Sequence, residues 1–490
     1  MRYFIILFSA LFFLTISCQG QKIRPPLVAG SFYPADPAVL NNMLNGFFAN
    51  VRAKRISEPI IALIVPHAGY PYAGHVAVEA YAQLKGRDIR RVVIIAPSHF
   101  DYFRGCSVFN GDGYATPLGT VTVDKDFARS LAKKSDRIFL SDRGHKRLPN
   151  GRGEHSLEVQ LPYLQKTLPS FTLVPVIMGE QSYQTCRALA RALDDLIKDS
   201  HTLVIASSDL SHYHPYQKAE ELDQKVIRAV EEWDYYNLSR NLQSRLWEAC
   251  GGGPIVATMM VAEHLGATEA RLLKYANSGD VEPYDRSRVV GYAAMALIKS
   301  PAHSKSSEFK LTPQEQQELL AIARKAVEMK VAEEKLYQPK KPKDQALLTD
   351  RGAFVTLTEQ GNLRGCIGYT APIKPLYLTV RDVAVEAASR DPRFQPVRKD
   401  ELKQLKYEIS VLSPFRHVDD VKRIKIGRDG LLIQEGGAVG LLLPQVPVGQ
   451  GWDRITFLRQ TCRKAGLPKD AWQDKQCDLF RFTAFVFGEH

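Results

Sequence analysis

Three short apolar runs, each leading to a histidine or an aspartate, constrain this chain more than any other feature of its sequence. The runs cover residues 60–66 (IIALIVP), 91–97 (RVVIIAP) and 202–208 (TLVIASS). They lead to His67, His99 and Asp209, respectively. Runs of this length, rich in β-branched residues, are typical of strands buried in a parallel sheet. Because ligands of open α/β sheets bind outside the carboxyl ends of the strands, the three runs predict one shared site.

The remaining pattern divides the chain into two domains. Strand-like and helical segments alternate over residues 23–299, which predicts an α/β domain with a layered, mostly parallel sheet. Residues 300–312 begin with a serine-rich stretch that lacks periodicity, and we interpret them as a linker. Thr312 and Pro313 then have the residue types of a helix N-cap and first turn. The mixed strands and helices of residues 313–490 predict a second domain of the α+β class.

We expect His67, His99 and Cys250 to bind a metal ion. Cys250 opens a Cys-Gly-Gly-Gly-Pro loop, whose glycines let the backbone come close to a bound group. Two imidazoles and a thiolate suit zinc, copper or iron, and three protein ligands leave one position open for water or substrate. Asp209 and His212 are then candidate catalytic residues, which would move protons or orient a ligand beside the metal.

Glu154 and His155 lie before a predicted helix and could add another acid/base pair. Each candidate also has a structural interpretation. A histidine at a strand end is more often a hydrogen-bonded loop residue, and a single cysteine is more often a buried, inert thiol. The convergence of three strand ends with matching chemistry favours the functional interpretation.

In this region the chain resembles the Memo family over about residues 24–298. The stretches that carry the resemblance are VPHAGYPYAG (65–74), PSH (97–99), EHSLEVQLP (154–162), SSDLSH (207–212), CG (250–251), SGD (278–280) and VGY (290–292). The resemblance implies a fold similar to the class III extradiol dioxygenases of the LigB type. It also implies that His67, His99 and Cys250 are the metal positions, that the metal is iron or copper, and that the activity is redox chemistry. A thiolate stands where the true dioxygenases have a carboxylate, which argues against ring cleavage as the reaction.

A second cysteine motif, LRGCIG, covers residues 363–368. Arg364 and Gly365 precede Cys366, and a neighbouring cation lowers a thiol pKa. Asp391 and Arg393 supply a further acidic and basic pair. The functional interpretation is an anion site with a reactive, catalytic Cys366. The structural interpretation is a glycine-bracketed strand with a buried cysteine, and an Asp–Arg pair that holds a turn.

The LRGCIG and DPRF (391–394) motifs, with EISVLS (408–413), PQV (444–446) and GW (451–452), resemble the AMMECR1 domain over about residues 313–488. Together, the two families resemble components B and A of the AmmeMemoRadiSam system, fused in one chain. This implies a radical SAM protein as a partner, and an unknown small-molecule or peptide substrate.

The N-terminal 22 residues resemble a bacterial lipoprotein signal and tether, because Arg2 precedes an apolar stretch that ends before Cys18. Cys18 would accept the lipid and hold the chain at the periplasmic side of the cell envelope. A cleaved ordinary signal or an uncleaved anchor are the alternatives. A radical SAM partner would be cytosolic, so either the segment is no signal and the chain is cytoplasmic, or the fusion works without that partner.

The formal net charge is +12, but no motif for reading DNA or RNA accompanies it, so we expect no nucleic-acid partner. Three functions remain open for the first domain: a non-haem iron or copper redox protein, a metal-dependent binding module without turnover, and a hydrolase with zinc-bound water. The first is our leading hypothesis.

Overall fold

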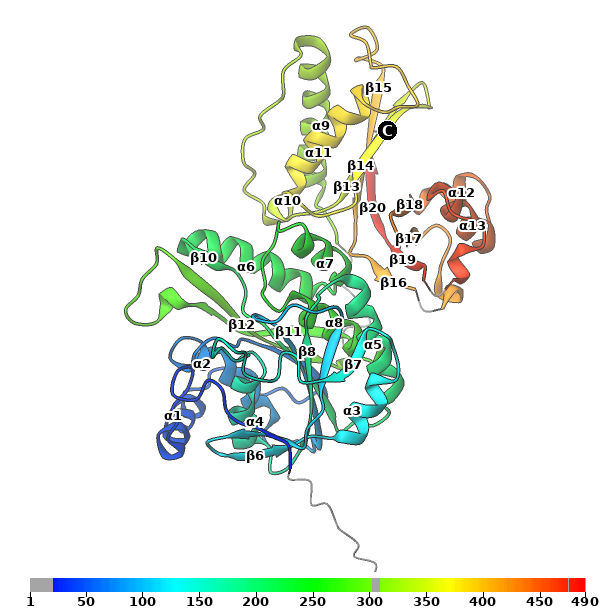
Figure 1. Ribbon diagram of the computed structural model, residues 1–490. Coiled ribbons are helices and arrows are strands. Elements are labelled where there is room, and N and C mark those ends of the chain that lie inside the picture. The colour runs from blue at the N-terminus through cyan, green and yellow to red at the C-terminus, as the bar shows by residue number, and fades with distance from the viewer. Residues whose placement is uncertain (1–20, 302–308, 419, 475, 490) are drawn as a thin grey trace, which may run out of the picture.

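The computed structural model describes residues 21–301, 309–418, 420–474 and 476–489 of the 490-residue chain (Figure 1). An N-terminal domain contains a large sheet, and a C-terminal domain contains two smaller ones. The predicted export segment with Cys18 lies outside the described residues, as do residues 302–308 of the predicted linker. Among the helices of the described residues, none combines the length and the apolar character needed to cross a membrane.

Among the described residues, the large sheet has nine strands. They lie in the order β10-β12-β2-β9-β3-β8-β4-β7, and β11 also pairs with β12. Their bounds are β2 (Ile60–Val65), β3 (Arg91–Pro97), β4 (Cys106–Phe109), β7 (Ile138–Ser141), β8 (Thr172–Met178), β9 (Thr202–Ser207), β10 (His212–His214), β11 (Glu269–Asn277) and β12 (Val289–Ile298). A separate small sheet contains β1 (Ile23–Arg24), β5 (Gly113–Thr116) and β6 (Gly119–Thr122).

The large sheet has parallel pairing in its centre and between β4 and β7 at one edge, and antiparallel pairing elsewhere. The pairs β2–β9, β9–β3 and β3–β8 are parallel, as predicted from their buried apolar runs. The flanking pairs β12–β2 and β8–β4 are antiparallel, so the sheet is mixed and the prediction of a mostly parallel sheet was too broad. The difference arises because β11 and β12 form an antiparallel pair, and β12 then joins β2 from that side.

The central strands are buried on both faces, because successive side chains of a strand point to opposite sides. Ile64 and Val93 belong to one apolar cluster, whereas Leu63 and Val92 belong to another. The first face is covered by α3 (Lys125–Ala132), α5 (Tyr183–Leu196), α6 (Tyr216–Glu231), α7 (Tyr235–Gln243) and α8 (Gly252–His264). The second face is covered by α1 (Pro37–Ala49), α2 (Tyr70–Tyr81) and α4 (Leu161–Thr167), as Figure 1 also shows.

The C-terminal domain is α+β, as predicted. One sheet has the order β14-β13-β15-β20 and packs against α9 and α11, and the other has the order β16-β19-β17-β18 and packs against α13. The strands are β13 (Ala353–Glu359), β14 (Asn362–Tyr369), β15 (Leu405–Leu412), β16 (Arg416–His417), β17 (Gly430–Glu435), β18 (Ala438–Leu442), β19 (Asp478–Phe482) and β20 (Ala484–Gly488). The helices are α9 (Pro313–Glu333), α10 (Gln345–Leu348), α11 (Leu376–Ser389), α12 (Gln445–Gly449) and α13 (Arg454–Lys464). Thr312 caps α9 in a capping box with Glu315, which confirms the predicted helix start.

The two domains share a continuous apolar core. The ring of Tyr236 on α7 lies 4.4 Å from that of Phe480 on β19 and 5.5 Å from that of Phe415, measured between ring centroids. A buried ion pair of 2.6 Å joins Arg187 on α5 to Asp478 at the start of β19. The interface is therefore packed like a domain interior, and nothing in the predicted linker had indicated this.

Candidate metal centre

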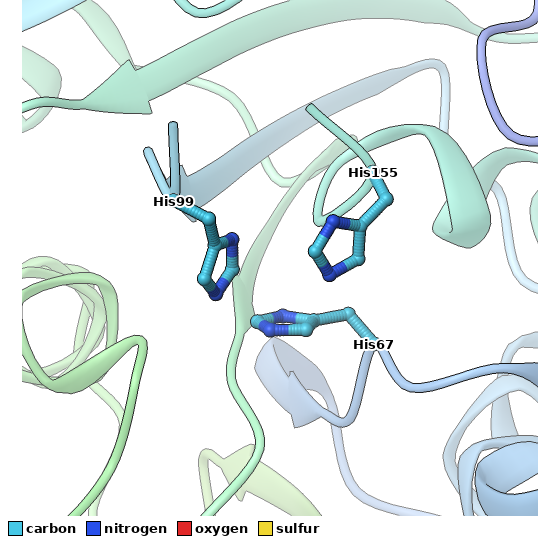
Figure 2. Close-up of side chains that lie close together, drawn as sticks. All are labelled: His67, His99 and His155. Carbon is cyan, nitrogen blue, oxygen red and sulfur yellow. The ribbon is translucent and has the colours of Figure 1, made fainter. Parts of the chain in front are cut away.

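Three predicted site residues converge because their strands are neighbours. β9 lies between β2 and β3, and all three strands run parallel. His67 follows β2, Asp209 follows β9 and His99 follows β3, each two residues after the last residue of the strand. Figure 2 shows the rings of His67 and His99 directed toward one another, together with that of His155. The convergence of strand ends expected from the three apolar runs is thus present in the geometry of the sheet, and their shared function stays a prediction.

His67 is buried and its tautomer follows from its hydrogen bonds. Its Nδ1 lies 2.9 Å from the hydroxyl oxygen of Ser207. That hydroxyl donates its own proton to the carbonyl of Ser156 at 2.5 Å, so it accepts from His67 Nδ1–H. The lone pair of His67 therefore lies on Nε2, 3.1 Å from the Cys250 sulfur. Burial, with the neighbouring His99 and His155, holds the pKa of His67 well below its usual value and keeps the ring neutral.

His99 is oriented by a buried carboxylate. Its Nδ1 donates to Glu154 Oε1 at 2.9 Å, and its backbone N–H donates to Glu154 Oε2 at 2.6 Å. Burial alone would raise the pKa of Glu154, but hydrogen bonding to His99 and the nearby imidazoles outweigh it and lower this pKa to about 2. Burial likewise opposes the charged form of His99, but Glu154 outweighs it and raises the pKa of His99. In the neutral ring, Nε2 is again the nitrogen that is left to accept a cation.

His155 is the third imidazole of the cluster. Its ring lies 4.7 Å from that of His99 and 5.3 Å from that of His67, and the three residues offer ligand atoms that all lie within 4.8 Å of one another. Burial lowers the pKa of His155 to about 4 even though Glu154 opposes the shift. The sequence had indicated His155 only as half of an acid/base pair with Glu154. Its position in the EHS stretch was the signal, but no pattern in the sequence places that stretch beside β2 and β3.

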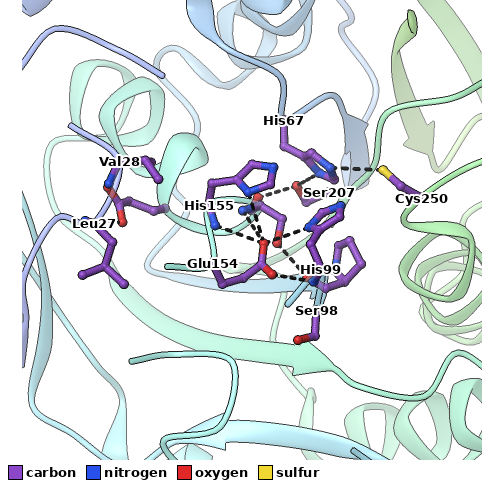
Figure 3. A network of polar contacts seen from close by, with 12 residues as sticks. Leu27, Val28, His67, Ser98, His99, Glu154, His155, Ser207 and Cys250 are labelled. Carbon is purple, nitrogen blue, oxygen red and sulfur yellow. Dashed lines mark hydrogen bonds and ion pairs between the residues drawn. The ribbon is translucent and has the colours of Figure 1, made fainter. Parts of the chain in front are cut away.

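Cys250 and Asp209 form a second group around His67. The ligand atoms of these three residues also lie within 4.8 Å of one another, so His67 belongs to both groups, whereas His99 and Cys250 belong to different ones. Figure 3 shows the contact between His67 and Cys250. Burial raises the pKa of the Cys250 thiol well above its usual value, and the charge of Asp209 adds to this. Burial also raises the pKa of Asp209 to about 6, although its carboxylate accepts the backbone N–H of His67 at 2.7 Å.

The glycines after Cys250 allow the close approach that the sequence predicts. A side chain at Gly251 would place its Cβ 2.2 Å from the carbonyl oxygen of Ser207. The Gly251 N–H donates to Ser208 Oγ at 2.9 Å, and Gln181 donates to the Cys250 carbonyl at 2.9 Å. The cysteine is therefore fixed against the end of β9, at the place where Asp209 leaves that strand.

The turn that carries Glu154 and His155 is supported by the segment at the start of the N-terminal domain. Arg24, which is buried, donates to Glu158 Oε2 and to the Glu154 carbonyl at 2.6 Å each. The hydroxyl of Tyr33 donates to Glu158 Oε1 at 2.6 Å. These bonds hold the backbone of Glu154, whose carboxylate binds His99, so residues far from the site contribute to its geometry.

His212 lies apart from both ligand groups in the described structure. Its Nδ1 donates to the Leu210 carbonyl at 2.8 Å, and its backbone N–H approaches Glu248 Oε2 at 3.4 Å. The neighbouring Tyr213 is exposed and has a positive φ of 62°, a conformation that side chains rarely adopt. The structure thus brings Asp209 into the cluster and leaves His212 beside it.

The LRGCIG motif has a different environment from the one expected. Burial raises the pKa of Cys366, and Thr356 Oγ1 donates to its sulfur at 3.2 Å. The guanidinium of Arg364 forms two hydrogen bonds to Glu401, at 2.7 and 3.1 Å. The expectation that Arg364 lowers the pKa of Cys366 is therefore wrong, because this arginine is neutralised elsewhere.

Asp391 and Arg393 hold the backbone around Cys366. Asp391 accepts two hydrogen bonds from the Arg393 guanidinium, at 2.6 and 2.9 Å, and one from the Cys366 N–H at 2.8 Å. Gly365 lies against α11, because a Cβ there would approach the Ala387 carbonyl oxygen to 2.2 Å. This geometry agrees with the structural interpretation of the motif, while a catalytic role of Cys366 stays a prediction.

Imidazole, thiol and carboxyl groups at the carboxyl ends of a central parallel β-unit define an α/β protein with a candidate metal centre. Comparison with known families is consistent with this. A model of the Memo-like proteins matches residues 24–296, more than half of the chain, and the chain belongs to that family. A model of the AMMECR1 family matches residues 320–487, so the chain joins the two domains, as predicted.

Curated relatives cover the N-terminal domain. A MEMO1 family protein of Methanothermobacter thermautotrophicus is 37% identical over 286 residues, 56% of this chain and 100% of its own length. A MEMO1 family protein of Methanosarcina mazei is 38% identical over 280 residues, again 56% of this chain and 100% of its own. Among solved structures, an uncharacterized protein from Pyrococcus horikoshii is 41% identical, with a TM-score of 0.36, over 37% of this chain and 95% of its own.

Proposed function

We propose that the Memo-like domain binds one redox-active metal ion, iron or copper, through His67, His99 and Cys250. The observation that supports this most directly is the shared tautomer of the two histidines. In both rings Nδ1 donates to a protein oxygen, so both neutral rings carry their lone pair on Nε2. Metal-binding histidines are commonly held in this way, and the Cys250 sulfur lies 3.1 Å from one of these nitrogens.

The residue types present fit such an ion, and His67, which is shared by the two ligand groups, lies between His99 of one group and Cys250 of the other. Imidazole and thiolate ligands suit iron, copper and zinc, whereas magnesium and calcium prefer oxygen. A bound iron or copper ion would supply electron transfer at the end of the sheet. In this proposal the domain is a redox protein related to the class III extradiol dioxygenases. His155 lies where it can hold a proton or complete the ligand set, because its ring lies beside both His67 and His99. Asp209, with its raised pKa, can hold a proton next to Cys250.

The test is the metal content of the purified chain, measured by elemental analysis for the wild type and for His67→Ala. His201→Ala is the matched control, because His201 lies in a surface ion pair with Asp88. We expect iron or copper near one ion per chain in the wild type and the control, and a loss in His67→Ala. Equal metal content in all three proteins would contradict the assignment of His67. Absence of metal from all three after reconstitution would favour a binding module without turnover.

Zinc-assisted hydrolysis is the second candidate function. The pKa of Asp209, raised to about 6, favours it, because a carboxyl group that titrates near neutral pH is suited to proton transfer from water. Zinc as the resident ion would select this function over redox chemistry, since zinc has no redox chemistry of its own.

We also propose a radical SAM protein as a partner, on the basis of the fusion of the two families. Co-purification of a tagged full-length chain with a co-expressed radical SAM protein would test this, and its absence at equal expression would contradict it. Lipid attachment at Cys18 stays a separate proposal. Labelling with a fatty acid analogue in the wild type but not in Cys18→Ala would support it.

A further inference from the structure

A groove of about 560 Å³ lies at the boundary between the two domains. The basic side chains that line it come from both sides, namely Arg191 and His264 from the Memo-like domain and Arg416, His417, Arg423 and Arg481 from the C-terminal domain. Its volume falls in the range of small-molecule sites, which occur preferentially at domain interfaces. The groove is separate from the candidate metal centre, since none of the imidazoles of that centre lines it.

Two of these arginines lie directly opposite each other in a sheet. β16 and β19 are antiparallel, and their register pairs Arg416 with Arg481. Like charges in opposite positions of an antiparallel pair repel and destabilise the sheet. An anion between or above the two guanidinium groups would remove this repulsion.

The carboxylates near these arginines do not satisfy them by close hydrogen bonds. Arg416 Nη1 donates at 3.3 Å to the Trp233 carbonyl, which carries no charge to neutralise it. Arg416 Nη1 lies 3.8 Å from Glu263 Oε1, and Arg481 Nη1 lies 3.8 Å from Asp429 Oδ1. By contrast, the neighbouring interdomain pair of Arg187 and Asp478 is 2.6 Å long. Asp429 is already bound by Arg428 at 2.6 and 2.8 Å, so it has little to offer Arg481.

Arg423 adds a third guanidinium to the same groove. It ends the short 3₁₀-helix η5 (Val421–Arg423), where its backbone N–H donates to the Asp420 carbonyl at 3.0 Å. Within the described parts of the chain, its guanidinium has no hydrogen bond or ion pair. Such a side chain, aimed at a groove that two further arginines line, is available for an anionic ligand. The planar fork of arginine matches the oxygens of phosphate and carboxylate groups.

Three carboxylates also line the groove, and they do not cancel its positive charge. Asp420 caps η5 by accepting the Lys422 N–H at 2.9 Å, and Glu263 accepts the Tyr235 hydroxyl at 2.9 Å. Asp194 lies 3.9 Å from His264. These hydrogen bonds come from neutral donors and leave the carboxylates charged. Four arginines face three carboxylates, so with both histidines neutral the lining keeps an excess of one formal positive charge.

We propose that this groove binds a small molecule with two or more linked phosphate groups, held by Arg416, Arg423 and Arg481. Linked phosphates can span neighbouring guanidinium groups, whereas a single phosphate would leave one of them without a partner. This site is independent of the proposed metal function.

The test is calorimetric titration of the full chain with pyrophosphate, with inorganic phosphate and ATP as further probes. We expect pyrophosphate to bind more tightly than phosphate, and Arg481→Gln and Arg423→Gln each to weaken its binding by about tenfold. Arg459→Gln is the matched control, because Arg459 is an exposed arginine of α13 that pairs with Asp470. ATP binding as tightly as pyrophosphate would identify the linked phosphates of a nucleotide as one source of the ligand group.

Thermal unfolding distinguishes a ligand site from a structural role of these arginines. Without pyrophosphate, we expect Arg481→Gln to leave the melting temperature unchanged or to raise it, because the substitution removes the repulsion with Arg416. With pyrophosphate, the melting temperature of the wild type should rise and that of Arg481→Gln should rise less. Absence of binding at millimolar pyrophosphate, or equal binding by the wild type and both variants, would overturn the proposal.

Discussion

The two half-buried cysteines of this protein, Cys250 and Cys366, lie in similar sequences but in different chemical environments. Both are flanked by glycine, and burial raises the pKa of both thiols. The Cys250 sulfur lies 3.1 Å from the lone-pair nitrogen of His67, whereas the Cys366 sulfur accepts the hydroxyl proton of Thr356 at 3.2 Å. The difference teaches that a glycine next to a cysteine indicates a close approach of the backbone. The chemistry of the thiol depends instead on the side chains that contact it in the folded protein.

The largest effect that we expect separates the two cysteines by metal affinity. Cys250→Ser should weaken metal binding by more than about 100-fold, because it removes a proposed thiolate ligand. Cys366→Ser should leave the affinity unchanged, because Cys366 lies in the other domain. Competition with a chelator of known affinity measures the metal affinity of each variant. Equal affinities in the two variants would contradict the comparison.

The Asp391 carboxylate is expected to act on stability instead. Asp391→Ala should lower the free energy of unfolding by about 2 kcal/mol, because it removes charged hydrogen bonds to Arg393 and to the Cys366 N–H. The Arg393 guanidinium holds the pKa of Asp391 well below its usual range. Its contribution to stability is therefore present above the unfolded pKa of about 4 and is lost as the pH falls below it. Denaturant unfolding of the wild type and of Asp391→Ala, at one pH above about 4 and one below it, checks this. Asp400→Ala, at an exposed position, is the control.

Glu154→Gln should weaken metal binding by more than its loss of stability explains, since the amide also leaves a buried donor of the site without an acceptor. An amide at this position cannot hold the Nδ1 proton of His99 as a carboxylate does, so we expect a loss of about tenfold in metal affinity. Glu221→Gln, on the exposed face of α6, is the matched control. A fall in affinity that is matched by a fall in melting temperature would instead indicate a structural role of Glu154.

The smallest effect concerns pH. The pKa of Cys250 is raised in the metal-free site, so a bound ion must displace its proton, and affinity should rise with pH by about tenfold per unit for each proton released. Apparent dissociation constants measured between about pH 6 and pH 8 give this slope. This slope gives the number of protons released on metal binding. In Cys250→Ser that number should fall by about one, whereas in Cys366→Ser it should not change. An identical slope in both variants would assign the proton to another group.

The sequence predicted the convergence of His67, His99 and Asp209 because parallel strands bring their carboxyl ends to one edge of the sheet. It also predicted the start of α9 at Thr312, where a local capping motif determines the structure. Both inferences depend on short-range patterns. His155 could not be placed in the same way, because its position depends on how a loop packs over the sheet.

The misjudged role of Arg364 has a local cause that the sequence hides. The register of β13 and β14 shifts between Leu357 and Thr358, which pair with Gly365 and Leu363, so Arg364 is left opposite no residue of β13. Its side chain is then free to reach Glu401. Such an irregularity follows from pairing between strands, and neighbouring residues in the sequence do not indicate it.

The shared core has a consequence for the synthesis of the chain. Tyr236 donates to Gln434 at 2.6 Å, across 198 residues of sequence, so its partner leaves the ribosome long after the Memo-like domain is complete. Gln434 lies 138 residues beyond residue 296, where the Memo-like match ends, so at typical rates of translation this delay amounts to roughly 7–28 s. During this time the aromatic face of α7 stays open to solvent. The growing chain must therefore keep a finished domain with an uncovered apolar face soluble until its second half emerges to cover it.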